Sequence, residues 1–456
     1  MKNILKVRDD HNPFFFESNR KQKYIISDDQ PRPNWLSSEE FSITELRGRI
    51  EPWLTALFQS EHLSLLAGSG LSTAIQYVAV GSLPANRMRK PELKTGCPYV
   101  DKIHAYVAKS ARENGRGEGN IEDYFRVINN LLHGLAILDK TDEHKELKEE
   151  YKKLIENFTL GILEGEKCII KADEECRTKA FNVLTTFLMS FASRTGTRER
   201  LNIFTTNYDR VIEAGAELAG LHLLDRFVGM LSPIFRSSRL DIDMHYNPPG
   251  IRGEPRYLEG VARFTKLHGS IDWVESGKII RRIGLPFGAS DFSPHLSNSG
   301  LEDSTKVMIY PNSSKDRETA EYPYVELFRD FASAICRPNS TLVTYGYGFG
   351  DEHINRVIRD MLTIPSTHLV IISYDEAQGR IMRIYDEIGR ASQISLLVGQ
   401  GLADIELLTE YFLPKPAIDR TTIRMSELLM QRYNSNEAEE IIQNNSSPTE
   451  GGAMEK

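Results

Sequence analysis

The stretch LNIFTTNYDRVIEAGAELAG, residues 201–220, has the pattern of a strand, a polar turn and a helix. Leu201–Phe204 is a short apolar run of the kind that a buried parallel strand shows. Thr206 and Asn207 lie where such a strand would end, and Asp209 can cap the helix that follows. Side chains at the carboxyl end of a strand in an open α/β sheet face the ligand crevice. We therefore expect the side chains of Asn207 and Asp209 to face a ligand-binding site.

A second strand-to-helix turn precedes this stretch in the chain. His62–Ala67 predicts a strand that runs into Gly68-Ser69-Gly70-Leu71-Ser72-Thr73. Glycines let the backbone approach phosphates, and the start of a helix favours their charge. The motif alone also fits a turn whose glycines serve only backbone geometry, because Thr73 replaces the third glycine of the dinucleotide fingerprint.

Further strand ends carry polar or glycine-rich residues. Apolar runs predict strands at Val261–Leu267, Thr341–Tyr345, Leu369–Ser373 and Ile394–Val398. His268 follows the first of them, a glycine turn at Gly346–Asp351 follows the second, and Asp375 follows the third. Taken singly, His268 is compatible with a hydrogen-bonded core histidine, and the turn with a simple flexible connection. Together the four motifs place two glycine turns, an amide and an imidazole at the ends of predicted strands.

The sequence between the glycine motif at 68–70 and the strand at 201 has the pattern of helices. No proline occurs from Tyr99 to Ser232, and Ile121–Leu138 has an apolar stripe at helical spacing, with Asn120 as its expected cap. A direct connection from a strand through a helix to the next strand needs far fewer residues. We therefore predict an α/β fold, a Rossmann-like parallel sheet with a large helical insertion after the first strand.

The domain organisation follows from these patterns and from the ends of the chain. Residues 1–45 are polar with scattered aromatics, which indicates an N-terminal arm laid against another part of the protein. The final residues are rich in Asn, Ser, Glu and Gly, which is typical of disorder. The predicted parts are a Rossmann-like domain at 46–74 and 199–415, a helical insertion at 75–198, a C-terminal helix at 416–434 and a disordered tail at 435–456.

Composition restricts the class of protein. The 456 residues include 40% hydrophobic and 26% charged side chains, as in ordinary globular proteins. The net charge of −8 argues against direct nucleic-acid binding. Charges interrupt the N-terminal sequence and no apolar run approaches the ~20 residues of a membrane span, so we expect a cytoplasmic protein without a signal peptide. The four cysteines form no C-x-x-C pair, so no metal site is predicted.

The order of the motifs resembles the sirtuin-like NAD-consuming fold, most closely the bacterial branch that hydrolyses NAD in anti-phage defence. The resemblance spans about residues 45–415. It implies a Rossmann-like domain that holds NAD, as substrate, in its crevice. The motifs that carry it are Gly68-Ser69-Gly70-Leu71-Ser72, Thr205-Thr206-Asn207-Tyr208-Asp209, Leu267-His268-Gly269 and the turn at Tyr345–Asp351.

The same resemblance implies roles for individual residues. Asn207 and His268 match the catalytic pair of the family. The first glycine loop would serve the phosphates, the second would serve a phosphate or ribose, and Asp375 would meet the adenosine ribose. The residues expected to bind NAD are Gly68, Ser69, Gly70, Ser72, Thr206, Asp209, Gly346, Tyr347, Gly348 and Asp375.

The expected reaction is hydrolysis of the nicotinamide–ribose bond to nicotinamide and ADP-ribose, which would deplete NAD as a defence effector. An NAD-dependent protein deacylase is a second possibility, but family members of that type carry paired cysteines, which this chain lacks. A non-catalytic NAD or ADP-ribose sensor is a third, although it would have no use for both Asn207 and His268. The resemblance also implies a homo-oligomer and pairing with a HerA-like DNA-translocating ATPase.

Overall fold

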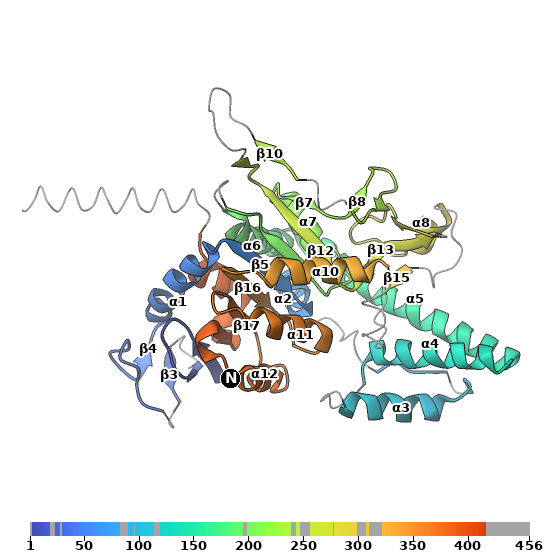
Figure 1. Cartoon of the computed structure of the whole chain (residues 1–456), viewed down its shortest axis with the longest axis horizontal. Helices are drawn as coiled ribbons and strands as arrows, with labels where there is room; N and C mark the ends of the chain where they lie inside the picture. The colour runs from blue at the N-terminus through green and yellow to red at the C-terminus, as the bar shows by residue number, and fades with distance from the viewer. Residues whose placement is uncertain are drawn as a thin grey trace, which may run out of the picture. The chain divides into compact units, whose positions relative to one another are not determined.

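The computed structural model describes residues 2–18, 23–27, 30–82, 90–94, 96–113, 119–194, 198–238, 243–246, 256–276, 278–298, 307–309 and 322–415 (Figure 1). Within the chain, Met1–Pro414 forms one compact unit. The predicted C-terminal helix at 416–434 and the predicted tail at 435–456 lie outside the described residues.

An eleven-stranded sheet in the order β4-β3-β2-β1-β18-β17-β16-β5-β6-β12-β7 forms the centre of this unit. Its strands from β18 to β7 are parallel to one another, which confirms the predicted α/β, Rossmann-like fold. Every residue of β5, β6, β16 and β18 is buried, as expected for strands covered on both faces. The parallel strands are β5 (His62–Ala67), β6 (Asn202–Thr205), β7 (His222–Leu224), β12 (Val261–Lys266), β16 (Ser340–Tyr345), β17 (His368–Ser373) and β18 (Ile394–Val398).

The connections of the sheet reverse direction between β5 and β16. From β5 the sheet grows through β6 to β12 on one side, and from β16 it grows through β17 to β18 on the other. β5 and β16 pair in parallel along their whole length, from His62 opposite Ser340 to Ala67 opposite Tyr345. In open α/β sheets, ligands bind outside the carboxyl ends of the strands at this kind of switch point. The fold therefore places the candidate site beside the ends of β5 and β16.

The segment predicted as an N-terminal arm, residues 1–45, forms strands that continue the sheet beyond β18. β1 pairs with β18 in antiparallel orientation, and β2, β3 and β4 follow outward. Asn3 connects these N-terminal strands to the segment after β18. Its Nδ2 donates to the carbonyl of Phe16 at 3.3 Å, and its Oδ1 accepts from the amide of Gly401 at 2.8 Å. The elements are β1 (Lys2–Lys6), β2 (Phe14–Ser18), β3 (Tyr24–Ile26), β4 (Glu40–Phe41) and the helix α1 (Ile43–Phe58).

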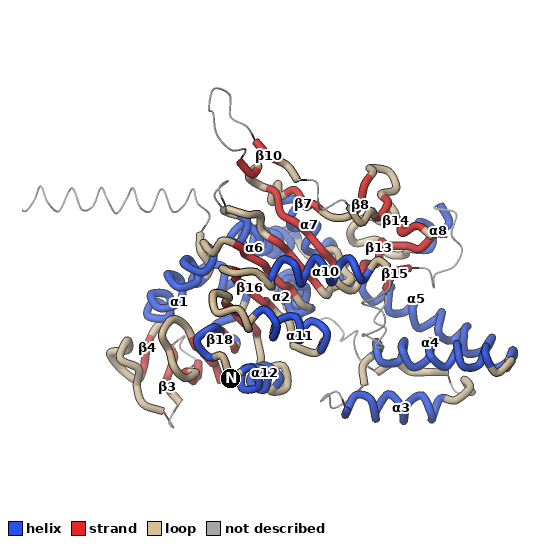
Figure 2. Tube along the Cα trace, in the orientation of Figure 1, coloured by secondary structure: helices blue, strands red, loops and turns tan. Residues whose placement is uncertain are grey.

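A series of helices separates β5 from β6, as the sequence predicts. Asn120 caps one of them, since its Oδ1 accepts from the amide of Asp123 at 3.0 Å. α2 packs against α5 and α6, whereas α3 packs on α4 and α4 on α5 (Figure 2). The helices are α2 (Ser69–Val80), α3 (Val100–Glu113), α4 (Ile121–Ile137), α5 (Thr141–Lys171) and α6 (Glu174–Ala192).

The remaining elements surround the sheet. A five-stranded sheet has the order β15-β13-β14-β9-β8, and β10 pairs with β11. None of the helices in the described part of the chain combines the length and the apolar character that crossing a membrane requires. The strands are β8 (Phe227–Val228), β9 (Ile234–Phe235), β10 (His245–Tyr246), β11 (Arg256–Tyr257), β13 (Gly269–Ser276), β14 (Ile279–Arg282) and β15 (Val307–Ile309). The helices are α7 (Val211–Leu218), α8 (Ser293–Asn298), α10 (Tyr324–Ile335), α11 (Glu352–Met361), α12 (Arg380–Ile388), η3 (Ala391–Gln393), α13 (Gln400–Ala403), α14 (Ile405–Leu407) and η4 (Leu408–Phe412).

Candidate functional site

The turn after β6 is hydrogen-bonded to the end of β5. Thr205 donates its hydroxyl to the carbonyl of Ala67 at 2.8 Å, and the same Oγ1 accepts from the amide of Asn207 at 3.0 Å. The backbone amide of Thr206 also donates to Ala67, at 3.3 Å. Two strands far apart in the sequence therefore end at a common point, and Asn207 is held there by backbone as well as side-chain contacts.

The Asn207 side chain is 6% exposed, and both hydrogens of its amide group are used. Nδ2 donates to the carbonyl of Gly68 and to Oγ of Ser72, each at 3.0 Å. Ser72 in turn donates to Oδ1 of Asp209 at 2.9 Å. This arrangement leaves the carbonyl oxygen Oδ1 of Asn207 as the acceptor that the side chain can offer to a ligand.

Asp209 has the capping role that the sequence allowed, and it also contacts Ser72; its predicted contact with NAD stays a prediction. Its Oδ1 accepts from the amide of Val211, the first residue of α7, at 3.2 Å, in addition to accepting from Ser72. The carboxylate thus stabilises the start of α7 and also anchors the hydrogen-bond chain that orients the Asn207 amide. Asp209 acts on the site through Ser72.

The two glycine loops interlock at the switch point. The amides of Gly68 and Gly70 donate to the carbonyls of Tyr345 and Gly346, at 2.9 and 3.1 Å. A Cβ atom on Gly68 would lie 2.4 Å from the Gly346 oxygen, and one on Gly70 would lie 2.6 Å from the Gly346 Cα. Gly346 itself has φ of +60°. Close loop packing therefore accounts for these glycines, and the predicted phosphate contacts of the loops, including Ser69, stay a prediction.

The other predicted ligand-binding residues lie around the second loop and the end of β17. Tyr347 is 3% exposed and donates its hydroxyl to Oδ1 of Asn355 at 3.2 Å, so a ligand contact from Tyr347 would have to use its backbone. Burial raises the pKa of the Tyr347 phenol well above its usual value, which keeps it a donor. The carbonyl of Gly348 accepts from Arg380 at 2.7 Å. Asp375 holds its own turn by accepting from the amide of Ala377 at 2.8 Å.

His268 stands directly after β12, and its neighbours include two residues that the sequence did not assign to the site. The amide of Leu267 donates to the carbonyl of Thr205 at 2.8 Å, which fixes the end of β12 beside the end of β6. The His268 ring is 8% exposed and lies 5.6 Å from the His353 ring, centroid to centroid. Asp351 and His353 follow the second glycine loop. Their place beside that motif is the one feature of the sequence that could have pointed to them.

The turn that carries Asn207 also contacts the helical insertion. Tyr208 donates its hydroxyl to Glu122 of α4 at 3.2 Å, and its ring packs 5.7 Å from Phe158 of α5. Arg210 binds Glu166 of α5, with its backbone amide at 2.9 Å and its Nη2 at 2.5 Å. Consecutive residues therefore alternate in their partners: Asn207 and Asp209 bond to Ser72, whereas Tyr208 and Arg210 bond to the insertion helices.

The contact between Arg210 and Glu166 is buried. The Glu166 side chain has no exposed surface, and the Arg210 side chain is 9% exposed. Burial raises the pKa of the Glu166 carboxyl, while the charge of Arg210 opposes this shift. Such a pair depends on each partner compensating the other, so it ties α5 rigidly to the turn that follows β6.

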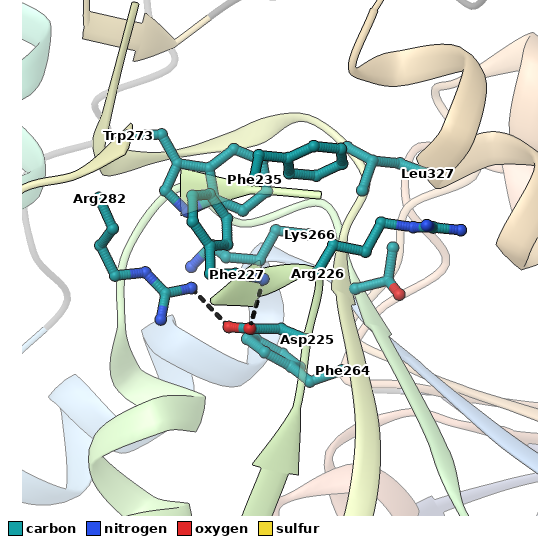
Figure 3. A pocket seen from close by; sticks show the side chains of 10 residues that line it. Asp225, Arg226, Phe227, Phe235, Phe264, Lys266, Trp273, Arg282 and Leu327 are labelled. Carbon is teal, nitrogen blue, oxygen red and sulfur yellow. Dashed lines mark hydrogen bonds and ion pairs between the residues drawn. The ribbon is translucent and has the colours of Figure 1, made fainter. Parts of the chain in front are cut away.

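A separate cavity lies beside Lys266 (Figure 3). Its walls include the aromatic rings of Phe227, Phe235 and Trp273. Arg282 borders it, stacked 4.5 Å from the Phe227 ring centroid and paired with Asp225 at 2.7 Å. The lining contains neither residue of the predicted catalytic pair. The cavity is thus not lined by the residues expected to carry the chemistry.

A family model described as a SIR2-like domain matches residues 201–390. A comparison with curated proteins found no match. The matched region includes Asn207, His268, the second glycine loop and Asp375, whereas the first glycine loop lies outside it. The match supports a sirtuin-like family for this part of the chain and implies that NAD is involved, as is compatible with an NAD-utilising enzyme.

We expect Glu166→Gln to lower the free energy of unfolding by about 3–5 kcal/mol, because it leaves the buried charge of Arg210 without its counterion. The measurement is denaturant unfolding of the purified protein. Glu164→Gln, two residues away on the same helix, is the matched control. Its side chain is 66% exposed, so the loss should stay within about 1 kcal/mol. Equal effects of the two substitutions would contradict the assigned role of the pair.

We expect Gly70→Ala to destabilise the protein by about 1–3 kcal/mol, because the new methyl group would force the two glycine loops apart. Gly134→Ala in α4 is the control, since nothing lies within 4 Å of its Cβ position. That substitution should leave stability unchanged or raise it by about 0.5–1 kcal/mol. Thermal unfolding of both variants measures the difference, and a harmless Gly70→Ala would refute the close packing.

Proposed function

We propose that this protein is an NAD glycohydrolase that cleaves the nicotinamide–ribose bond and releases nicotinamide and ADP-ribose. The observation that carries the proposal is the Asn207 amide at the switch point. Gly68 and Ser72 take both of its hydrogens, so its carbonyl oxygen is oriented for a ligand. His268 lies in the turn after β12, which neighbours β6 in the same sheet. An oriented acceptor and a proton-accepting ring are the two groups that this hydrolysis requires.

The chemistry follows from the charge of the substrate. Cleavage breaks the bond between the ribose C1′ and the pyridinium nitrogen, and nicotinamide departs as a neutral molecule that needs no acid. The ribose carbon gains oxocarbenium character, as in glycoside hydrolysis. Water adds to that carbon and loses one proton, so NAD⁺ and water give ADP-ribose, nicotinamide and H⁺. The protein must hold the dinucleotide, place the water and accept the proton.

Asn207 and His268 supply the last two of these functions. The free acceptor of Asn207, Oδ1, can hold either the attacking water or a ribose hydroxyl. A neutral imidazole at His268 takes the proton, a contribution typically worth ~10²–10⁴ in rate. Both residues are less than one-tenth exposed, and electrostatic interactions are stronger in such surroundings than in bulk water.

Hydrolysis is favoured over protein deacylation by the cysteines. All four are free thiols at separate places in the described chain, and none belongs to a cluster of potential metal ligands there. A paired-cysteine zinc module of the deacylase type therefore has no counterpart among these residues. An acyl-lysine peptide that stayed intact while NAD was consumed would support hydrolysis.

We further propose that NAD depletion serves anti-phage defence and is restrained by assembly, as a homo-oligomer and with a HerA-like ATPase. An enzyme that destroys NAD must be held inactive until it is needed. Two adjacent apolar residues that are almost fully exposed are the surface feature on which we base an association role. Met230 and Leu231, between β8 and β9, are each 96% exposed, and Ile137 at the end of α4 is 82% exposed.

We expect Asn207→Ala and His268→Ala each to lower the rate of NAD loss by about 100-fold or more. The measurement is chromatographic detection of nicotinamide and ADP-ribose after incubation with NAD. Circular dichroism and thermal unfolding establish that both variants fold. Wild-type rates in either folded variant would remove that residue from the mechanism.

A matched variant separates the chemistry of Asn207 from its contacts with the first glycine loop. Ser72→Ala removes one partner of Nδ2 but keeps the amide and its contact with Gly68. Its NAD hydrolysis should fall less than that of Asn207→Ala. If Ser72→Ala is as inactive as Asn207→Ala, the amide acts by holding the loop rather than through its carbonyl oxygen.

We expect the purified protein to form an oligomer that Leu231→Glu weakens, because a charge would replace an apolar side chain at the association surface. Light scattering after size-exclusion chromatography gives the mass of each species. Asn182→Glu, at an exposed polar position of α6, is the control. Co-expression with a HerA-like ATPase should yield a joint complex. A monodisperse monomer with full constitutive NAD hydrolysis would contradict the restraint by assembly.

A further inference from the structure

His268 belongs to a cluster of three potential metal ligands. One donor atom each from His268, Asp351 and His353 lies within 4.8 Å of the other two. Both histidines are buried and Asp351 is partly buried. Donors that share one ion at about 2.1 Å stand about 3–4 Å apart, so small rotations of the side chains bring the three onto a common centre.

The backbone holds the two halves of this cluster in place independently. His268 follows β12, whose end is fixed to β6 through the Leu267 amide. Asp351 and His353 open α11, where the Asp351 carbonyl accepts from the Asn355 amide at 2.9 Å and from the Tyr347 hydroxyl at 3.4 Å. The side chains therefore converge from two elements that are each anchored by main-chain contacts.

The donor set and its surroundings suit a divalent transition metal. Two imidazoles and one carboxylate are ligands of zinc, iron, manganese and related ions, and they leave positions for water or a further ligand. The Phe328 ring meets His353 edge-on at 4.7 Å, and Tyr208 lies 6.3 Å from His268. Aromatic walls of this kind limit water and strengthen the attraction between a cation and the Asp351 carboxylate.

We propose that His268, Asp351 and His353 bind one divalent transition metal ion, with zinc as the probe of choice. The site uses imidazole and carboxylate donors and is independent of the cysteines.

Metal binding has a consequence for the reaction, and this consequence rests on the proposed NAD hydrolysis. The nitrogen of His268 that coordinates the ion has no lone pair left with which to take a proton. The metal-bound protein is therefore the inactive form, and removal of the metal releases the base. A divalent ion at this site acts as an inhibitor of the enzyme rather than as its cofactor.

The decisive experiment measures binding directly. Full-length protein stripped of metal by chelator and dialysis is titrated with Zn²⁺ by calorimetry, and bound zinc is counted by mass spectrometry. We expect one zinc per chain, and His353→Ala or Asp351→Asn should weaken binding by about 10-fold or more. His133→Ala, at an exposed position of α4, is the control and should bind as the wild type does. Equal zinc binding by wild type and both site variants would overturn the proposal.

A second arm tests the effect on hydrolysis. Zinc should inhibit NAD loss by the wild type over the concentration range in which it binds, and His353→Ala should require about 10-fold more zinc for the same fractional inhibition. Full wild-type activity at saturating zinc would refute the competition between metal and base. The calorimetric result stands even for a protein that consumes no NAD, so failure of the metal site and failure of the proposed hydrolysis are distinguishable.

Discussion

The close approach of two backbone loops at the switch point is the constraint on which the rest of the site depends. The carbonyl oxygen of Gly346 occupies the space where a side chain at position 68 would begin. The loops can meet only because glycine stands on both sides, and their amide-to-carbonyl bonds then lock the ends of β5 and β16 together. Asn207 is fastened to the same place through Gly68, so its orientation depends on this contact.

The turn at 207–210 connects that contact to the helical insertion. Because consecutive side chains there have different partners, the residues bonded to Ser72 alternate with residues bound to α4 and α5. A rigid, buried ion pair between Arg210 and Glu166 transmits any displacement of α5 to the backbone beside Asn207. The helical insertion thus has a mechanical connection to the turn that carries Asn207.

The sequence predicted the parts of the fold that depend on local pattern. β5 and β18 begin and end where their apolar runs do, and Asn120 caps its helix as expected. Long-range partners have no such pattern. The pairing of β1 with β18, the inward direction of the Tyr347 phenol and the contact of Arg210 with Glu166 all join residues that only the folded chain brings together. The grouping of His268 with His353 is of the same kind, because close cysteine pairs are visible in a sequence whereas these two histidines are 85 positions apart.

That separation bears on how substrate and metal would influence each other. His353 and Asp351 open α11, immediately after the second glycine loop, whereas His268 belongs to the other half of the sheet. A dinucleotide held between the two loops would set the position of α11 relative to β12, and with it the distance between the metal donors. Linkage is reciprocal, so an ion that draws these donors together must change the affinity for NAD by the same factor by which NAD changes the affinity for the ion. The surroundings of the His268 imidazole therefore depend on the start of α11 as well as on β12, and the proposed roles of His268 as base and as metal ligand depend on the same contact.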